Sequence, residues 1–481
     1  MRADRILCIA LFLVLSSVYF ATVSGITCSN DGSHYALTRA IAEERRFTIE
    51  SYDEYAEGND IAIRNGELFS DRPPGTALFA SALYQVGSWL PAPLRELESR
   101  YDAENPRLLY AMLVPVWTGA GTVLLLYLLL RELNVSIFSS LTTSVIFGLG
   151  TIHWKYSSVL FSHAPSAFLV MLSIYLAVRM ARTSVPHWTL PAALGIIGGF
   201  AVLVEYSNAL LVVSVGLYLL LIVVRRPSGS RPAHLLLFIA GGLLPAGFLA
   251  FYNQVNFGSP FALSYDYAVN YPWAGQFLDT FSFPLGQGLR AMLIWGEGGG
   301  WCDPTCYNQG LFLLSPVLLL SIFGIPSYVR RARRESVLTL GLFLIYLTLF
   351  AKHRTFHGFT ADGRYLAPFL ALWCIPLAFF VDRIAEWSDQ PAYQALVYLI
   401  LYGTFFVSVR TIFLHIGFSY HYELNLGEIN GMIARPENWF YLLDHVFRNP
   451  ENLPLLWLLE GVLVALGLGG WWAGRELLDQ R

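Results

Sequence analysis

The sequence predicts an all-α polytopic membrane protein with about twelve transmembrane helices. Hydrophobic residues make up 55% of the 481-residue chain, and the mean hydropathy is +0.50. Charged residues make up 14%, whereas a typical soluble domain contains about 25%. The apolar residues are also grouped in runs that are long enough, or nearly so, to cross a hydrocarbon layer as helices. We therefore treat residues 1–481 as one membrane domain.

The first apolar run covers residues 6–25 and follows a short charged start. Its length of about 20 residues exceeds the 7–15 of a signal-peptide core, which favours a retained helix over a cleaved leader. Further spans are predicted at residues 108–130, 137–152, 164–181, 190–204, 209–224, 235–252, 310–329, 337–351, 366–381, 392–413 and 453–472.

The loop after the first span, residues 26–107, contains shorter helical segments. Asp31 or Ser33 is placed to cap a short helix. Between residues 76 and 90 the apolar side chains recur at helical spacing, but the segment is too short and too mixed to cross a membrane. We predict that these juxtamembrane helices lie at the membrane interface.

The distribution of arginine orients the chain. When the N-terminus is placed in the cytoplasm, the short connectors on that side are the arginine-rich ones, as expected for cytoplasmic loops. Both termini are then cytoplasmic, in a plasma (inner) membrane. The long external loops are residues 26–107, 253–309, 352–365 and 414–452.

Several classes of function are disfavoured. The net charge of −3 gives no basis for a nucleic-acid partner, and no glycine-rich loop follows a strand to hold a nucleotide. The five cysteines do not form a disulfide framework. A local bridge between Cys302 and Cys306 in one external loop stays an open alternative.

Asp31 follows the first span directly and has His34 and Tyr35 as neighbours. One interpretation is a helix cap, a common use of aspartate. The other is a general base that takes a proton from an acceptor hydroxyl at the mouth of the bundle.

A second acid-bearing turn, Asp71-Arg72-Pro73-Pro74, precedes the interfacial helix. Prolines fix the backbone, so a purely structural turn is one interpretation. The functional interpretation makes Arg72 a fixed guanidinium for phosphate oxygens and Asp71 a candidate metal ligand.

Two other external segments are basic. Lys155 either binds phosphate or anchors the turn at the interface, and His163 either binds metal or phosphate or packs at a helix start. The third long loop gathers charged and aromatic groups on the outer side, which predicts an anionic client. Its members are Lys352, His353, Arg354, His357, Asp362, Arg364 and Tyr365.

Glu205 is one of two acidic residues that intrude into the predicted spans. It lies near the outer end of its span, so a lining role or snorkelling fits better than a midplane proton relay. A transporter would be expected to place ionisable groups near the midplane, and this chain places them in external loops.

The run Asp31-Gly-Ser-His-Tyr35-Ala, followed by Asn65-Gly66 and Asp71-Arg72-Pro73-Pro74-Gly75, resembles the first periplasmic loop of C-type-fold (GT-C) membrane glycosyltransferases. The similar families are the aminoarabinose transferases of lipid A and the protein O-mannosyltransferases. The run Gly363-Arg364-Tyr365-Leu-Ala-Pro368 also looks like bacterial members of this group.

The resemblance implies a GT-C fold and transfer of a sugar from a polyprenyl-phosphate carrier to a lipid, glycan or protein acceptor on the external side, with inversion. It implies Asp31 as the base, with Arg72, Arg364 and Tyr365 near the donor phosphate. It also implies a divalent metal at Asp71. The chain departs from the pattern at Gly32, where relatives carry a second acid, and at His34 and His163.

The alternatives are an oligosaccharide ligase of the same architecture and a lipid or solute transporter. Nucleotide sugars are confined to the cytoplasm, so an external donor is expected to be lipid-linked. Its tail would lie between helices, with Arg72, Lys155 and Arg364 around the phosphate.

Overall fold

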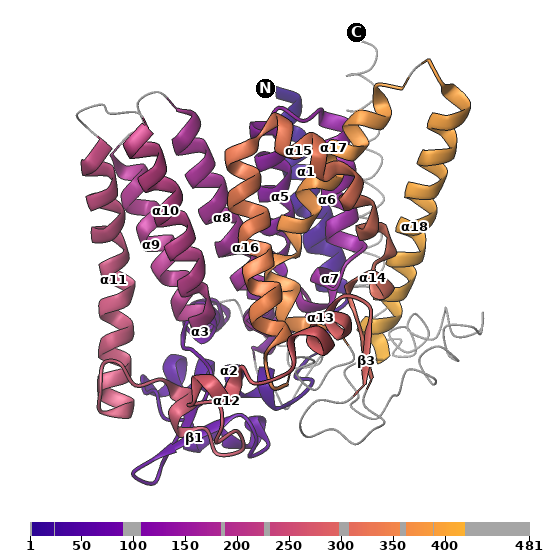
Figure 1. Ribbon diagram of the computed structural model, residues 1–481. Helices are drawn as coiled ribbons and strands as arrows, with labels where there is room; N and C mark the ends of the chain where they lie inside the picture. The colour runs from indigo at the N-terminus through magenta and orange to yellow at the C-terminus, as the bar shows by residue number, and fades with distance from the viewer. Residues whose placement is uncertain are drawn as a thin grey trace.

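The computed structural model describes residues 2–23, 25–89, 107–183, 188–225, 231–297, 307–355, 362–387 and 389–418. These residues form a helical bundle with two small two-stranded sheets (Figure 1). The N-terminus of α1 lies at one end of the bundle, and α2, α12 and β1 lie at the opposite end (Figure 1). Helix α2, which carries Asp31, His34 and Tyr35, thus lies at the end opposite the start of α1.

The long helices of the bundle are α1 (Arg2–Ala21), α5 (Leu108–Glu132), α6 (Ile137–Leu149), α8 (His163–Arg182), α9 (Thr189–Val204), α10 (Ala209–Arg225), α11 (Arg231–Phe257), α16 (Arg333–Ala351), α17 (Leu370–Ala385) and α18 (Pro391–Phe418). The first loop holds α2 (Ser29–Arg39), the π-helix η1 (Ala40–Glu44), η2 (Glu50–Ala56), β1 (Ile61–Arg64), β2 (Glu67–Ser70) and α3 (Gly75–Ser88). The other connections hold α7 (His153–Tyr156), η3 (Tyr206–Asn208), η4 (Ser264–Tyr267), α12 (Phe277–Thr280), α13 (Leu285–Leu293), β3 (Trp295–Glu297), β4 (Tyr307–Gln309), α14 (Leu311–Leu314), η5 (Pro316–Leu320), α15 (Ser321–Arg331) and η6 (Arg364–Phe369).

Eight helices in the described part of the chain are long and apolar enough to cross a membrane, which confirms a multi-pass membrane protein. They are Asp4–Ala21, Leu108–Glu132, His163–Arg182, Tyr206–Val224, Pro232–Phe257, Arg333–Ala351, Arg364–Ala385 and Pro391–Phe413. Each matches a predicted span. The spans predicted at 137–152 and 190–204 are the shorter helices α6 and α9, and the span predicted at 453–472 lies outside the described residues.

The single span predicted at residues 310–329 is wrong. The structure divides this stretch into α14, η5 and α15. Ser315 adopts φ −135° and ψ 71°, and Pro316 begins the next helix. Because proline has no N–H and its ring clashes with the preceding turn, the apolar run cannot continue as one helix.

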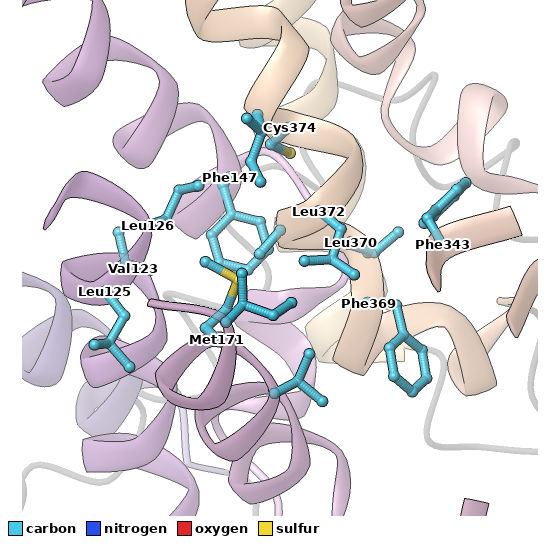
Figure 2. Packing of buried hydrophobic residues seen from close by; sticks show 14 of the residues in the cluster. Val123, Leu125, Leu126, Phe147, Met171, Phe343, Phe369, Leu370, Leu372 and Cys374 are labelled. Carbon is cyan, nitrogen blue, oxygen red and sulfur yellow. The ribbon is translucent and has the colours of Figure 1, made fainter. Parts of the chain in front are cut away.

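A continuous apolar core joins α5, α6, α8 and α17. Leu126 of α5, Phe147 of α6 and Met171 of α8 lie opposite Leu370 and Leu372, at the start of α17 (Figure 2). All five side chains are completely buried. This packed centre gives the segments at the end of the bundle a rigid support.

A β-hairpin organises the loop between α1 and α5. Strands β1 and β2 pair antiparallel, with Ile61 opposite Ser70. Asn65 and Gly66 at the tip have φ values of 55° and 87°, the left-handed conformations that a type I′ turn requires. This register brings Asp60, just before β1, next to Asp71, just after β2.

The segment predicted to form an interfacial helix is α3. Its buried face includes Gly75, Ala80 and Tyr84, and Trp89 at its end is 77% exposed. Gly75 has no room for a side chain, because a Cβ there would lie 2.6 Å from the backbone of Leu203 and Val204. The turn before α3 therefore sits directly on the end of α9.

Gly32 provides a test of the packing in the first loop. A Cβ at Gly32 would lie 1.8 Å from the carbonyl oxygen of Tyr55. We expect Gly32→Ala to lower the free energy of unfolding by about 1–3 kcal/mol, because the backbone of η2 must move. The matched control is Gly247→Ala on α11, where nothing lies within 4 Å of the added carbon. That variant should be up to about 1 kcal/mol more stable in detergent unfolding, because alanine is the better helix former. Equal stability of the two variants would contradict the close approach of η2 to α2.

Candidate functional site

The site is built around Arg72 at the base of the hairpin. The Nη2 atom of Arg72 forms a close ion pair with Oδ1 of Asp60. The other carboxylate oxygen of Asp60 accepts a hydrogen bond from Ser29 Oγ at 2.5 Å, and its carbonyl oxygen accepts one from Ser33 Oγ at 2.7 Å. The helix α2 thus holds Asp60, which fixes the guanidinium of Arg72. The Arg72 side chain still keeps 17% of its surface accessible.

Asp71 is the second acid beside Arg72. Its Oδ1 lies 3.1 Å from Arg72 Nε, but the two atoms are not aligned for a hydrogen bond. Burial raises the pKa of Asp71 to about 7, although the charge of Arg72 acts in the opposite direction. The Asp71 carboxyl is therefore mostly neutral below pH 7, which leaves the positive charge of Arg72 less compensated.

Arg364 provides the second cation of the site. It begins η6, and 6% of its surface is exposed. Its guanidinium lies over the rings of Phe161 at 5.3 Å and Tyr365 at 5.5 Å. Tyr365 is also within electrostatic reach of Arg72. The two arginines predicted from separate loops thus share one region.

Two histidines line this region. His34 is fully buried, and neither of its ring nitrogens has a hydrogen-bond partner among the described residues. Burial and the charge of Arg72 lower the pKa of His34 to about 3, so its ring is neutral. The ring of His163 stacks on Tyr156 at 4.7 Å and lies within electrostatic reach of Arg364 and Arg72.

Lys155 is completely buried in an ion pair. Its Nζ lies 2.6 Å from Oδ2 of Asp362, and neither side chain is exposed. Tyr156 donates a hydrogen bond to the other carboxylate oxygen at 2.7 Å. Burial raises the pKa of Asp362, but the charges of Lys155 and His415 and the hydrogen bonds from Lys155 and Tyr156 together outweigh it, so the pKa is lowered. The carboxylate of Asp362 therefore already neutralises Lys155, and a phosphate-binding role for Lys155 stays a prediction that this placement does not support.

Asp31 has the contacts of a helix cap. Its Oδ2 accepts hydrogen bonds from the N–H and the hydroxyl of Thr27, and its Oδ1 accepts from the N–H groups of Cys28 and Gly32. These contacts use about all of the lone pairs of a carboxylate. Burial raises the pKa of Asp31 to about 6 despite them. The assignment of Asp31 as the base stays a prediction.

The remaining candidates lie around the two arginines or in the packing. Tyr35 packs edge-on against Tyr55 and Tyr84. His353 lies 4.9 Å from the ring of Tyr365. His357 lies outside the described residues, as do Cys302 and Cys306.

Asp60 was not identified from the sequence. Its signal was available, because Asn65-Gly66 marks a two-residue hairpin. Counting outward from that turn pairs Ile61 with Ser70, which places Asp60 beside Asp71. This position identifies Asp60 as a candidate partner for Arg72.

The metal predicted at Asp71 lacks a complete ligand set in the described residues. No group of three histidine, cysteine, aspartate or glutamate side chains is placed there to hold an ion. Oδ1 of Asp71 lies 3.1 Å from Arg72 Nε, so this carboxyl faces a cation. The reaction steps proposed below involve only side chains of this protein.

Comparisons with known proteins bear on the fold. Residues 73–258 match the family model described as dolichyl-phosphate-mannose-protein mannosyltransferase, which is less than half of the chain. A search of curated protein sequences found no significant match.

Among solved structures, ArnT from Cupriavidus metallidurans bound to undecaprenyl phosphate is 14% identical, with a TM-score of 0.50, over 97% of this chain and 74% of ArnT. The chain has the fold of ArnT. The resemblance to GT-C membrane glycosyltransferases stated from the sequence is confirmed.

The archaeal oligosaccharyltransferase AglB from Archaeoglobus fulgidus, in complex with an inhibitory peptide and a dolichol-phosphate, also matches. It is 12% identical over 84% of this chain, with a TM-score of 0.50. The chain spans only 56% of that AglB chain. The rest of the AglB chain has no counterpart in this chain.

The ion pair between Lys155 and Asp362 generates a stability prediction. We expect Lys155→Met to lower the free energy of unfolding by about 3–5 kcal/mol, because it leaves a buried carboxylate without its partner. The double variant Lys155→Met/Asp362→Asn should recover much of this loss, because no buried charge remains. Arg331→Gln, which breaks the partly exposed pair with Asp382, is the control and should cost at most about 1 kcal/mol. A double variant as unstable as the single one would contradict this account.

Asp31→Asn tests the cap against the base. The amide has one acceptor oxygen fewer and turns an NH₂ group toward N–H donors, so the variant should be less stable by about 1–2 kcal/mol. Asp53→Asn, at an exposed carboxyl of η2, is the control and should unfold like the parent protein. Full transfer activity in folded Asp31→Asn would remove the assignment of Asp31 as the base.

Proposed function

We propose that the protein is an integral membrane glycosyltransferase that moves a sugar from a polyprenyl-phosphate carrier to an acceptor on the external side of the plasma membrane. The observation that carries this proposal is the convergence of Arg72 and Arg364. They come from separate loops, and both charges lower the pKa of one carboxyl, Glu205, whose burial raises it. Two fixed guanidinium groups at the end of a membrane bundle suit a lipid-linked phosphate.

The family model and the two solved structures support the choice of donor. The model is named for dolichyl-phosphate-mannose, and ArnT and AglB were solved with undecaprenyl phosphate and a dolichol-phosphate. In this chain the phosphate would lie between Arg72 and Arg364, with Tyr365 beside it. Both ring nitrogens of neutral His34 and Nδ1 of His163 are buried beside the arginines without a hydrogen-bond partner among the described residues.

The reaction we propose breaks the bond between sugar C1 and the phosphate oxygen. The departing phosphate carries negative charge, and each fixed donor is worth about 3–4 kcal/mol in such a transition state. The acceptor oxygen attacks C1 from the opposite face, so the anomeric centre is inverted. A carboxylate removes the acceptor proton, and the sequence assigns this role to Asp31.

The proposed acceptor is a lipid, a glycan or a protein. We propose that both termini lie in the cytoplasm, because the arginine-rich connectors are expected on that side of the membrane. An oligosaccharide ligase of the same fold is the alternative, and it would accept a donor with several sugars. A lipid or solute transporter is disfavoured, because the ionisable cluster lies at the end of the bundle.

Arg72→Lys tests the phosphate site in the purified full-length protein. Lysine keeps the charge but lacks the planar fork, so we expect donor affinity to fall about 10–100-fold, the equivalent of a lost charged hydrogen bond. The measurement is transfer from a synthetic polyprenyl-phosphate sugar, together with binding of polyprenyl phosphate alone. Arg46→Lys on the first loop is the control, because Arg46 is exposed, and it should behave like the parent protein. Unchanged affinity in folded Arg72→Lys would overturn the assignment.

A further inference from the structure

We propose that Glu205 is a catalytic residue that takes the proton from the acceptor hydroxyl during transfer. This inference rests on the proposed glycosyl transfer and deepens it. It assigns the proton to a residue other than the one that the sequence motif favours.

The fold places Glu205 within electrostatic reach of Arg72 and Arg364. Glu205 is the first residue after α9, where the backbone turns extended, with φ −149° and ψ 122°. The absence of a side chain at Gly75 lets the turn that carries Arg72 rest on Leu203 and Val204, immediately before Glu205. The two residues before Glu205 are therefore held against the end of the turn that carries Arg72.

Hydrogen bonds also link the residue after Glu205 to the turn that carries Asp71 and Arg72. Tyr206, next in sequence, has its hydroxyl 3.2 Å from Ser264 Oγ. Ser264 in turn donates to the carbonyl oxygen of Asp71 at 2.6 Å. A chain of contacts thus runs from the Glu205 segment through η4 to the turn of Asp71 and Arg72.

Accessibility separates Glu205 from Asp31. Asp31 is completely buried, and its oxygens are used by the cap. Glu205 is partly exposed. Among the described residues, Ser162 Oγ donates a hydrogen bond to Oε1 of its carboxylate. A carboxylate can accept about four hydrogen bonds, so Glu205 has lone pairs free for an acceptor hydroxyl. A general base must reach the proton that it removes.

The proposed step balances without another reactant. The acceptor oxygen forms a bond to sugar C1 while the bond from C1 to the phosphate oxygen breaks. The electron pair of that bond leaves with the phosphate, held by Arg72 and Arg364. The acceptor proton moves to Glu205 and is later lost to water.

The groups around Glu205 set the pH at which it works. Burial raises its pKa above the usual 4.5, whereas the Ser162 hydrogen bond and both arginine charges lower it. Because a base must be deprotonated, turnover should fall as the pH drops through this pKa. The titratable or charged groups that interact with Glu205 from neighbouring elements are Arg72, Arg364, Tyr206, Tyr265 and Tyr346.

The experiment compares Glu205→Gln with the parent protein and with Glu67→Gln, an exposed carboxyl on β2. We expect Glu205→Gln to lower kcat by about 10²–10⁴-fold, while its affinity for polyprenyl phosphate is unchanged. Its kcat/KM should lack the decline at low pH. Glu67→Gln should keep the kcat and the pH profile of the parent protein. Thermal unfolding and polyprenyl-phosphate binding show whether each variant is folded.

Azide separates a base from a structural residue, because it is a nucleophile that carries no proton to remove. It should restore sugar release in Glu205→Gln, giving a glycosyl azide of inverted configuration, but not in Arg72→Lys, which binds the donor poorly. Parent-like kcat in folded Glu205→Gln would overturn the proposal, as would weakened donor binding with no azide rescue. Absence of transfer by the parent protein itself would instead overturn the proposed function, and the role of Glu205 with it.

Discussion

The buried ion pair between Asp60 and Arg72 is the interaction on which the site depends. A guanidinium taken out of water is costly unless a carboxylate faces it. The hairpin register supplies that carboxylate, because Ile61 pairs with Ser70 and so brings Asp60 beside Arg72. Hydrogen bonds from Ser29 and Ser33 then attach α2 to the same point. The first loop can close only in the arrangement that satisfies this charge.

A second buried pair does the same for the other arginine. Lys155 of α7 and Asp362 lie 2.6 Å apart, and the backbone N–H of Arg364 donates to the carbonyl oxygen of Asp362 at 2.7 Å. The pair therefore holds the start of η6 against α7. The two arginines are positioned independently, one by the first loop and one by the packed bundle. The two arginines come together where the first loop contacts the helical bundle.

The sequence predicted the parts that local pattern determines. Long apolar runs predicted the spans, and the prediction failed at residues 310–329, where Pro316 interrupts a run whose average hydropathy is still high. Arg72 and Arg364 were found because each lies in a short motif. The partner of Lys155 could not be found in this way, because 207 residues separate it from Asp362 and no period or spacing links them. For Asp31 the sequence left cap and base open, and only coordinates show which atoms its oxygens contact.

The proposed glycosyl transfer needs opposite charges in one place, and that requirement limits where a base can lie. The phosphate needs cations, yet the same cations lower the pKa of a nearby carboxyl and make it a weaker base. Burial acts in the opposite direction, as the pKa of about 7 at Asp71 shows. Full burial, however, removes access to the acceptor, as at Asp31. Glu205 lies between these limits, near both arginines and partly exposed. The base that we propose in this position would keep its proton affinity and still reach the acceptor hydroxyl.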